Sequence, residues 1–129
     1  MLVIKMFLMS IITAIQRTRH KVVISKEDLN MFRGSQVLTD DPAVERARSA
    51  HRNDLENILP YLIIGLLYVF TDPNTTAAMW LYRIGAMARI LHTCVYAFVP
   101  VPQPARAICF FTTAGIMVYM SVRVFIHFF

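Results

Sequence analysis

The chain has 129 residues and a formal net charge of +5, and 57% of its residues are hydrophobic while only 16% are charged. A typical soluble domain is about 45–50% apolar and about 25% charged. A chain this short has too much surface for its volume to bury such an excess in water. The composition therefore argues against an ordinary soluble domain, a disordered tail or a disulfide scaffold, and it predicts one membrane domain over residues 1–129.

The positive charge is not arranged for nucleic acid. Residues 16–57 carry eight Lys and Arg side chains and seven of the eight acidic ones, so this stretch is nearly neutral. The excess comes from five cations within or beside apolar runs, namely Lys5, Arg83, Arg89, Arg106 and Arg123. No nucleic-acid partner is expected. Two cysteines are too few for a disulfide framework, and the histidines lack metal-ligand spacing, so no metal site is expected.

The first predicted helix is the apolar run Met1–Ile15, which is interrupted by Lys5 and is short for a membrane span of about 20 residues. Either the N-terminus is truncated within this helix, or the helix continues through Gln16 and Thr18. Truncation is favoured, because Lys5 would then lie inside the span. The run lacks the basic region of a cleavable signal peptide. Residues 17–41 are polar and are predicted to form a loop of low regularity.

The second predicted helix extends from Pro42 to about Phe70. Asp41 is expected to cap it, with Pro42 at the first helical position. Its first half is highly charged and its second half, residues 58–70, is apolar, so the helix should begin in water and end in the membrane. Pro60 should kink it.

A turn at Thr71–Asn74 and three prolines within residues 100–104 delimit the last two helices, Thr75–Val99 and Ala105–Phe129. The sequence thus predicts an all-α integral membrane protein with four transmembrane helices. Four spans place both termini on one side. The loop after the first helix is rich in Lys and Arg, so this loop and the loop after the third helix are expected on the other, cytoplasmic side. Arg106 should then lie at the same membrane face as Arg52.

Polar side chains are expected to gather between the last three helices. Arg89, His92 and Tyr96 share one face of the third helix by their spacing, and Asn53 and Glu56 share one face of the second. An intramembrane Arg needs a partner or a polar cavity. Two readings stay open: Arg89 pairs with Glu56 or Asp54 to fix the helix register, or it lines an anion site. Arg suits carboxylates, so the pocket fits a ligand with several carboxylates and one ammonium group.

Three ordered motifs resemble the MAPEG superfamily, the membrane-associated proteins of eicosanoid and glutathione metabolism. They are Ala50-His51-Arg52-Asn53-Asp54-Leu55-Glu56-Asn57, Ala88-Arg89-Ile90-Leu91-His92-Thr93 with Tyr96, and Pro102-Gln103-Pro104-Ala105-Arg106-Ala107. The resemblance is strongest to its microsomal glutathione transferase branch, in an insect-like form, with the prostaglandin E synthase branch as a near relative. It implies a homotrimer in the endoplasmic reticulum membrane, with the mitochondrial outer membrane as a second location. It also implies glutathione bound between subunits.

The resemblance also assigns roles to particular residues. Glutathione would be held by Arg17, Arg52, Asn53, Glu56, Arg89, His92 and Tyr96. Arg106 is the expected catalytic residue, because an Arg beside a helix N-terminus stabilises a thiolate. Lipophilic electrophiles and lipid hydroperoxides are the expected substrates.

Three positions depart from the prostaglandin synthase pattern: Ser49 replaces an Arg, and Ala107 and Phe110 replace residues with hydroxyls. Asp28 matches a loop Asp of that branch. The balance favours a glutathione transferase with peroxidase activity over a prostaglandin H to E isomerase. A non-enzymatic scaffold is the third alternative.

Overall fold

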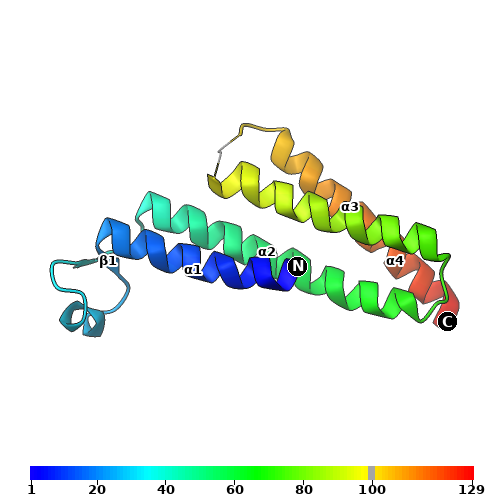
Figure 1. The fold of residues 1–129 in the computed structure, drawn as a ribbon, viewed down its shortest axis with the longest axis horizontal. Coiled ribbons are helices and arrows are strands. Elements are labelled where there is room, and N and C mark those ends of the chain that lie inside the picture. The colour runs from blue at the N-terminus through cyan, green and yellow to red at the C-terminus, as the bar shows by residue number, and fades with distance from the viewer. Residues whose placement is uncertain (99–100) are drawn as a thin grey trace. The chain divides into compact units, whose positions relative to one another are not determined.

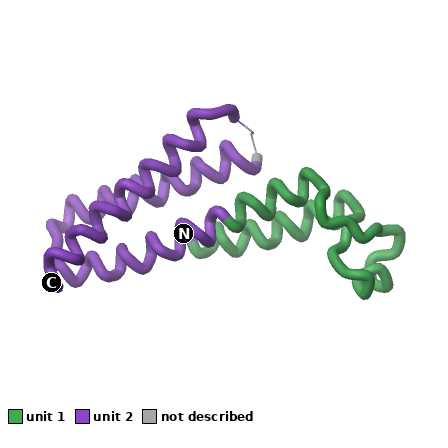
Figure 2. Tube along the Cα trace, turned by 180° about the vertical axis from the view of Figure 1, so that it is seen from behind, with its two compact units in different colours: residues 1, 3–52 green, residues 2, 53–129 purple. Residues whose placement is uncertain are grey.

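The computed structural model describes residues 1–98 and 101–129 and is helical. Its elements, in chain order, are α1 (Leu2–His20), β1 (Val22–Val23), the 3-10 helix η1 (Glu27–Asn30), β2 (Gln36–Val37), α2 (Pro42–Val69), α3 (Thr75–Thr93), the π-helical turn η2 (Cys94–Phe98) and α4 (Ala105–Phe128) (Figure 1). The chain divides into two compact units, residues 1 and 3–52, and residues 2 and 53–129 (Figure 2). Helices are present at all four predicted places.

In the first unit, α1 continues through Gln16 and Thr18 to His20, as one of the two readings of the sequence allowed. Basic side chains in its last turn suit the negative end of the helix dipole. Lys21 then adopts a left-handed conformation, with φ of 52°, and its N–H bonds back to the carbonyls of Arg17 and Thr18. This cap ends the helix. The truncation of the N-terminus stays a prediction.

The segment after α1 is more regular than expected. β1 and β2 pair in parallel, with Val22 opposite Gln36 and Val23 opposite Val37, and η1 lies between them in the sequence. The prediction of an irregular loop over residues 17–41 was wrong on this point. Two-residue strands show no periodicity in a sequence, and their pairing depends on contacts across the loop rather than on local signals.

The start of α2 confirms the predicted cap. The Oδ1 atom of Asp41 accepts hydrogen bonds from the backbone N–H groups of Ala43 (3.0 Å) and Val44 (3.1 Å). Its Oδ2 atom lies 3.0 Å from Nδ1 of His20. The Val44 N–H foremost, with help from His20 and Ala43, holds the pKa of the Asp41 carboxyl below its ordinary value. The helix then runs unbroken across Pro60 to Val69, so the expected kink stays a prediction.

In the second unit, tyrosine hydroxyls tie α2 to α3. Tyr61 donates to the backbone carbonyls of Leu81 (3.3 Å) and Tyr82 (2.9 Å), and Tyr82 donates to the carbonyl of Gly65 (2.9 Å). Gly85 leaves room for the buried Tyr61 ring. These bonds compensate hydroxyls that would be costly to bury without partners.

The third helix was predicted over Thr75–Val99. In the structure its α-helical part, α3, ends at Thr93, and the π-helical turn η2 follows directly. Val99 and Pro100 lie outside the described residues. α3 packs along α4, and the two are seen side by side in Figure 1. Among the described helices, α4 alone is long and apolar enough to cross a membrane by length and composition. Membrane spans at the other three helices therefore stay a prediction.

Candidate functional site

A buried polar cluster joins α2 to α3 in the second unit. The Nη2 atom of Arg89 donates to Oδ1 of Asp54 (3.0 Å) and to Oδ1 of Asn53 (2.6 Å). The Thr93 hydroxyl lies 3.3 Å from both Asp54 carboxylate oxygens. The Arg89 and Asp54 side chains are fully buried. Of the two readings left open for Arg89, the structure shows the pairing between helices, and Asp54 is an ion-pair partner of Arg89.

A second cluster lies where η2 meets the start of α4, and it is built from planar groups. The His92 and Tyr96 rings are nearly parallel, with their centroids 6.0 Å apart and their planes inclined by 10°. The Cζ atom of Arg106 lies over the Tyr96 ring, 5.2 Å from its centroid. His92 is buried, and Tyr96 and Arg106 are half-buried. His92 and Tyr96, which were predicted from their spacing, therefore lie together with Arg106, which was predicted from the expected topology and the family resemblance.

The surroundings of Arg106 differ from those of Arg89. Among the described residues, no carboxylate forms an ion pair with Arg106, whereas Arg89 pairs with Asp54. The Nε atom of Arg106 is buried without a hydrogen-bond partner among these residues, and this feature does not distinguish the two arginines. Arg106 lies in the first turn of α4, where backbone N–H groups point outward and add positive potential. This arrangement concentrates positive charge and suits an anion.

The remaining predicted residues of α2 differ in their exposure. Arg52 and Glu56 are exposed and stand four residues apart on one continuous helix, while Asn53 between them is half-buried and bonded to Arg89. An exposed cation and an exposed carboxylate on neighbouring turns can bind groups of both signs.

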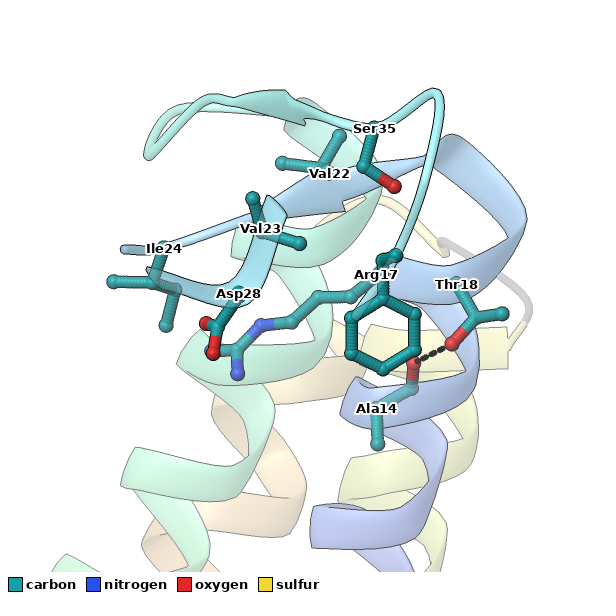
Figure 3. A pocket seen from close by; sticks show the side chains of 9 residues that line it. Ala14, Arg17, Thr18, Val22, Val23, Ile24, Asp28 and Ser35 are labelled. Carbon is teal, nitrogen blue, oxygen red and sulfur yellow. Dashed lines mark hydrogen bonds between the residues drawn. The ribbon is translucent and has the colours of Figure 1, made fainter. Parts of the chain in front are cut away.

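Arg17 lines a cavity of about 210 Å³ in the first unit. Figure 3 shows its guanidinium pointing toward the Asp28 carboxylate, beneath apolar side chains of β1. The lining residues are Ala14, Arg17, Thr18, Val22, Val23, Ile24, Asp28, Phe32 and Ser35. The Nε atom of Arg17 is buried without a hydrogen-bond partner. Two residues singled out in the sequence, Arg17 in the last turn of α1 and Asp28 in η1, thus share one pocket.

The sequence did not single out Thr93 or assign a site role to Asp54. The sequence did contain a hint of both residues, because Asp54 lies within the charged half of α2 and Thr93 directly follows His92. The spacing of residues does not show, however, which face of α2 packs against α3. Within residues 1–98 and 101–129, no group of three His, Cys, Asp or Glu side chains is arranged to hold a metal ion.

Comparison with known proteins gives a consistent result. The profile of the MAPEG family matches residues 1–126. The chain is 44% identical over 123 residues to microsomal glutathione S-transferase 1 of Homo sapiens, covering 92% of this chain and 79% of that protein. The same protein of Rattus norvegicus is 43% identical over the same coverage. Prostaglandin E synthase of Homo sapiens is 41% identical over 96 residues, which is 74% of this chain and 63% of that protein.

Proposed function

The chain belongs to the MAPEG family, and we propose that it is a membrane-bound glutathione transferase. Its similarity to microsomal glutathione S-transferase 1 extends over 92% of the chain. Glutathione is a peptide with carboxylates at both ends, an ammonium group and a thiol, so it matches a site that contains several Arg side chains and one exposed carboxylate. The observation that carries the proposal is the setting of Arg106, an arginine at a helix N-terminus with no ion-pair partner among the described residues.

Arg106 is the proposed catalytic residue. A free thiol has a pKa of about 8.5, so only a few per cent is thiolate at neutral pH. A guanidinium that forms no ion pair among the described residues, next to outward-pointing N–H groups, favours the thiolate and lowers the thiol pKa. The thiolate then attacks a lipophilic electrophile, and a carbon–sulfur bond forms as the leaving group departs or the double bond takes up a proton.

The same thiolate accounts for peroxidase activity. It attacks the terminal oxygen of a lipid hydroperoxide, the oxygen–oxygen bond breaks, and the alcohol leaves after taking a proton. The resulting sulfenic acid reacts with a second glutathione to give the disulfide and water. Both reactions therefore need the same feature of the site, an anionic sulfur near Arg106.

The other predicted residues bind the rest of glutathione. Glu56 is assigned to the ammonium group, because it is the exposed carboxylate on an otherwise cationic stretch of α2. The carboxylates and peptide groups of glutathione are assigned to Arg17, Arg52, Asn53 and Arg89. Each of these residues either contacts glutathione itself or positions a neighbouring residue that does. His92 and Tyr96 lie beside the thiol end, with Arg106.

We also propose that the protein is a homotrimer of four-span subunits in the endoplasmic reticulum membrane, with the mitochondrial outer membrane as a second location. Two observations support this. Large apolar side chains are exposed along α4, among them Phe111, Val118 and Phe125, and lipid or a neighbouring subunit would cover them. Arg52 and Glu56 are exposed on a single subunit, as residues of a site shared with a neighbouring subunit would be.

A prostaglandin H to E isomerase is the alternative that the similarity to prostaglandin E synthase supports. Ala107 and Phe110, which follow Arg106 at the start of α4, offer no side-chain hydroxyl for such chemistry. A scaffold without activity would not need an arginine held apart from carboxylates.

The test is to purify the protein in detergent with glutathione and to assay two reactions side by side. One is conjugation of glutathione to a small aromatic electrophile, and the other is conversion of prostaglandin H. We expect conjugation to dominate. Fast isomerisation without conjugation would reverse the two readings, and the absence of both reactions would favour the scaffold.

A further inference from the structure

The Tyr96 ring is a platform shared by two other planar groups. The His92 imidazole is stacked against it at 6.0 Å, and the Arg106 guanidinium carbon lies over it at 5.2 Å. A guanidinium within about 6 Å of an aromatic centroid is attracted by the ring face. The face of the Tyr96 ring therefore contacts the guanidinium of Arg106, the proposed catalytic residue, and this contact does not involve the Tyr96 hydroxyl.

The backbone explains how the ring reaches Arg106. Tyr96 lies in the middle of η2, a π-helical turn, and such turns often mark functional sites because they re-aim side chains. The Val101 N–H donates to the Val95 carbonyl (3.1 Å), which ties this turn to the chain that enters α4. The turn thus holds the ring next to the first turn of the helix that carries Arg106.

The kind of contact matters for the charge. Arg89 is held by the Asp54 carboxylate, so its charge is compensated within the subunit. Among the described residues, Arg106 has no such ion pair and is held over a neutral ring instead. A ring face fixes a guanidinium in place and leaves the N–H edge and the full positive charge available to an anion.

We propose that Tyr96 is a positioning residue that acts through the face of its ring, holding Arg106 in place for the glutathione thiolate without neutralising it. This inference rests on the proposed function. It assigns to the aromatic face a role separate from any hydrogen bond between the Tyr96 hydroxyl and glutathione.

The test measures the ultraviolet absorbance of glutathione thiolate bound to the purified protein, as a function of pH, in three variants. Tyr96→Phe keeps the ring and removes the hydroxyl, and Tyr96→Leu removes the ring. Tyr119→Leu removes a partly exposed tyrosine ring about 20 Å further along α4 and serves as the matched control. Glutathione affinity is measured by calorimetry in each variant.

Tyr96→Leu is expected to lower the thiolate fraction at neutral pH by about 3-fold to 30-fold, and to move the titration midpoint to higher pH. Tyr96→Phe should retain most of the signal, and Tyr119→Leu should match the wild type. Should Tyr96→Leu not yield a glutathione-binding protein, Tyr96→Met replaces it, because an unbranched side chain is well tolerated in helices.

Two results overturn the inference while the proposed function stands. One is a wild-type thiolate signal that persists in the variant without the ring, and the other is an equal loss in Tyr96→Phe, which would make the hydroxyl responsible. A wild-type protein that binds glutathione but shows neither thiolate nor conjugation overturns both the inference and the proposed function.

Discussion

The buried pair of Arg89 and Asp54 gives the sharpest stability prediction. Arg89 Nη2 lies 3.0 Å from Asp54 Oδ1, and both side chains are fully buried. At an effective dielectric constant of about 20, their Coulomb attraction is about 5.5 kcal/mol. Asp54→Asn keeps a similar shape but leaves the Arg89 charge uncompensated. Removing one partner of a buried ion pair costs about 3–5 kcal/mol, so we expect a fall on the order of 10 °C or more in the unfolding midpoint.

The assay is thermal unfolding in detergent, and Asp72→Asn in the exposed turn between α2 and α3 is the matched control. That control should change the stability by less than about 0.5 kcal/mol. The double variant Asp54→Asn with Arg89→Gln removes both charges and should recover part of the loss, so the two effects should not add. The account is contradicted if Asp54→Asn has the same unfolding midpoint as the wild type. It is also contradicted if the loss of stability in the double variant equals the sum of the two single losses, because the pair would then not join α2 to α3.

Three further predictions follow from individual contacts. Gly85→Ala should destabilise the protein by about 1–3 kcal/mol in thermal unfolding, because the new methyl would lie 2.7 Å from the buried Tyr61 ring. The Val44 N–H, as the largest cause, lowers the pKa of the Asp41 carboxyl. The ionised carboxylate therefore contributes its full stabilisation of α2 above the ordinary carboxyl pKa, and this contribution is lost as pH falls through the lowered pKa. Thermal unfolding between pH 3 and 7 should show this loss, and Asp41→Asn should reduce its pH dependence. Glu56→Gln should weaken glutathione binding in calorimetry while assembly survives, and unchanged affinity would remove Glu56 from the site.

The fold could be predicted where the signals were local. The prolines near residues 42 and 104, the Asp41 cap and the long apolar runs each mark a helix end or a helix body, and the structure has helices at all four places. The parallel pair of β1 and β2 could not be predicted in the same way, because its register depends on contacts between residues about fourteen apart.

The candidate site could be predicted as a set of residues but not as an arrangement. Spacing placed Arg89, His92 and Tyr96 on one helix face, which gave no reason to separate them. In the structure Arg89 donates a hydrogen bond to Asp54, while the Tyr96 ring lies against the Arg106 guanidinium. The difference arises from tertiary packing and from the π-helical turn at residues 94–98, and neither is encoded in a periodic pattern.

The central claim is that Arg106 holds the glutathione thiolate. It is tested most directly by the ultraviolet thiolate absorbance of bound glutathione at neutral pH, in the wild type, Arg106→Lys and Arg106→Ala. Arg106→Ala should still bind glutathione but lose most of the signal, with turnover lower by about 100-fold or more, as at other preorganised anion sites. Arg106→Lys keeps the charge without the planar fork, so it should retain part of both. A thiolate signal and turnover that persist in Arg106→Ala would contradict the account and leave Arg106 as an anchor at the membrane surface.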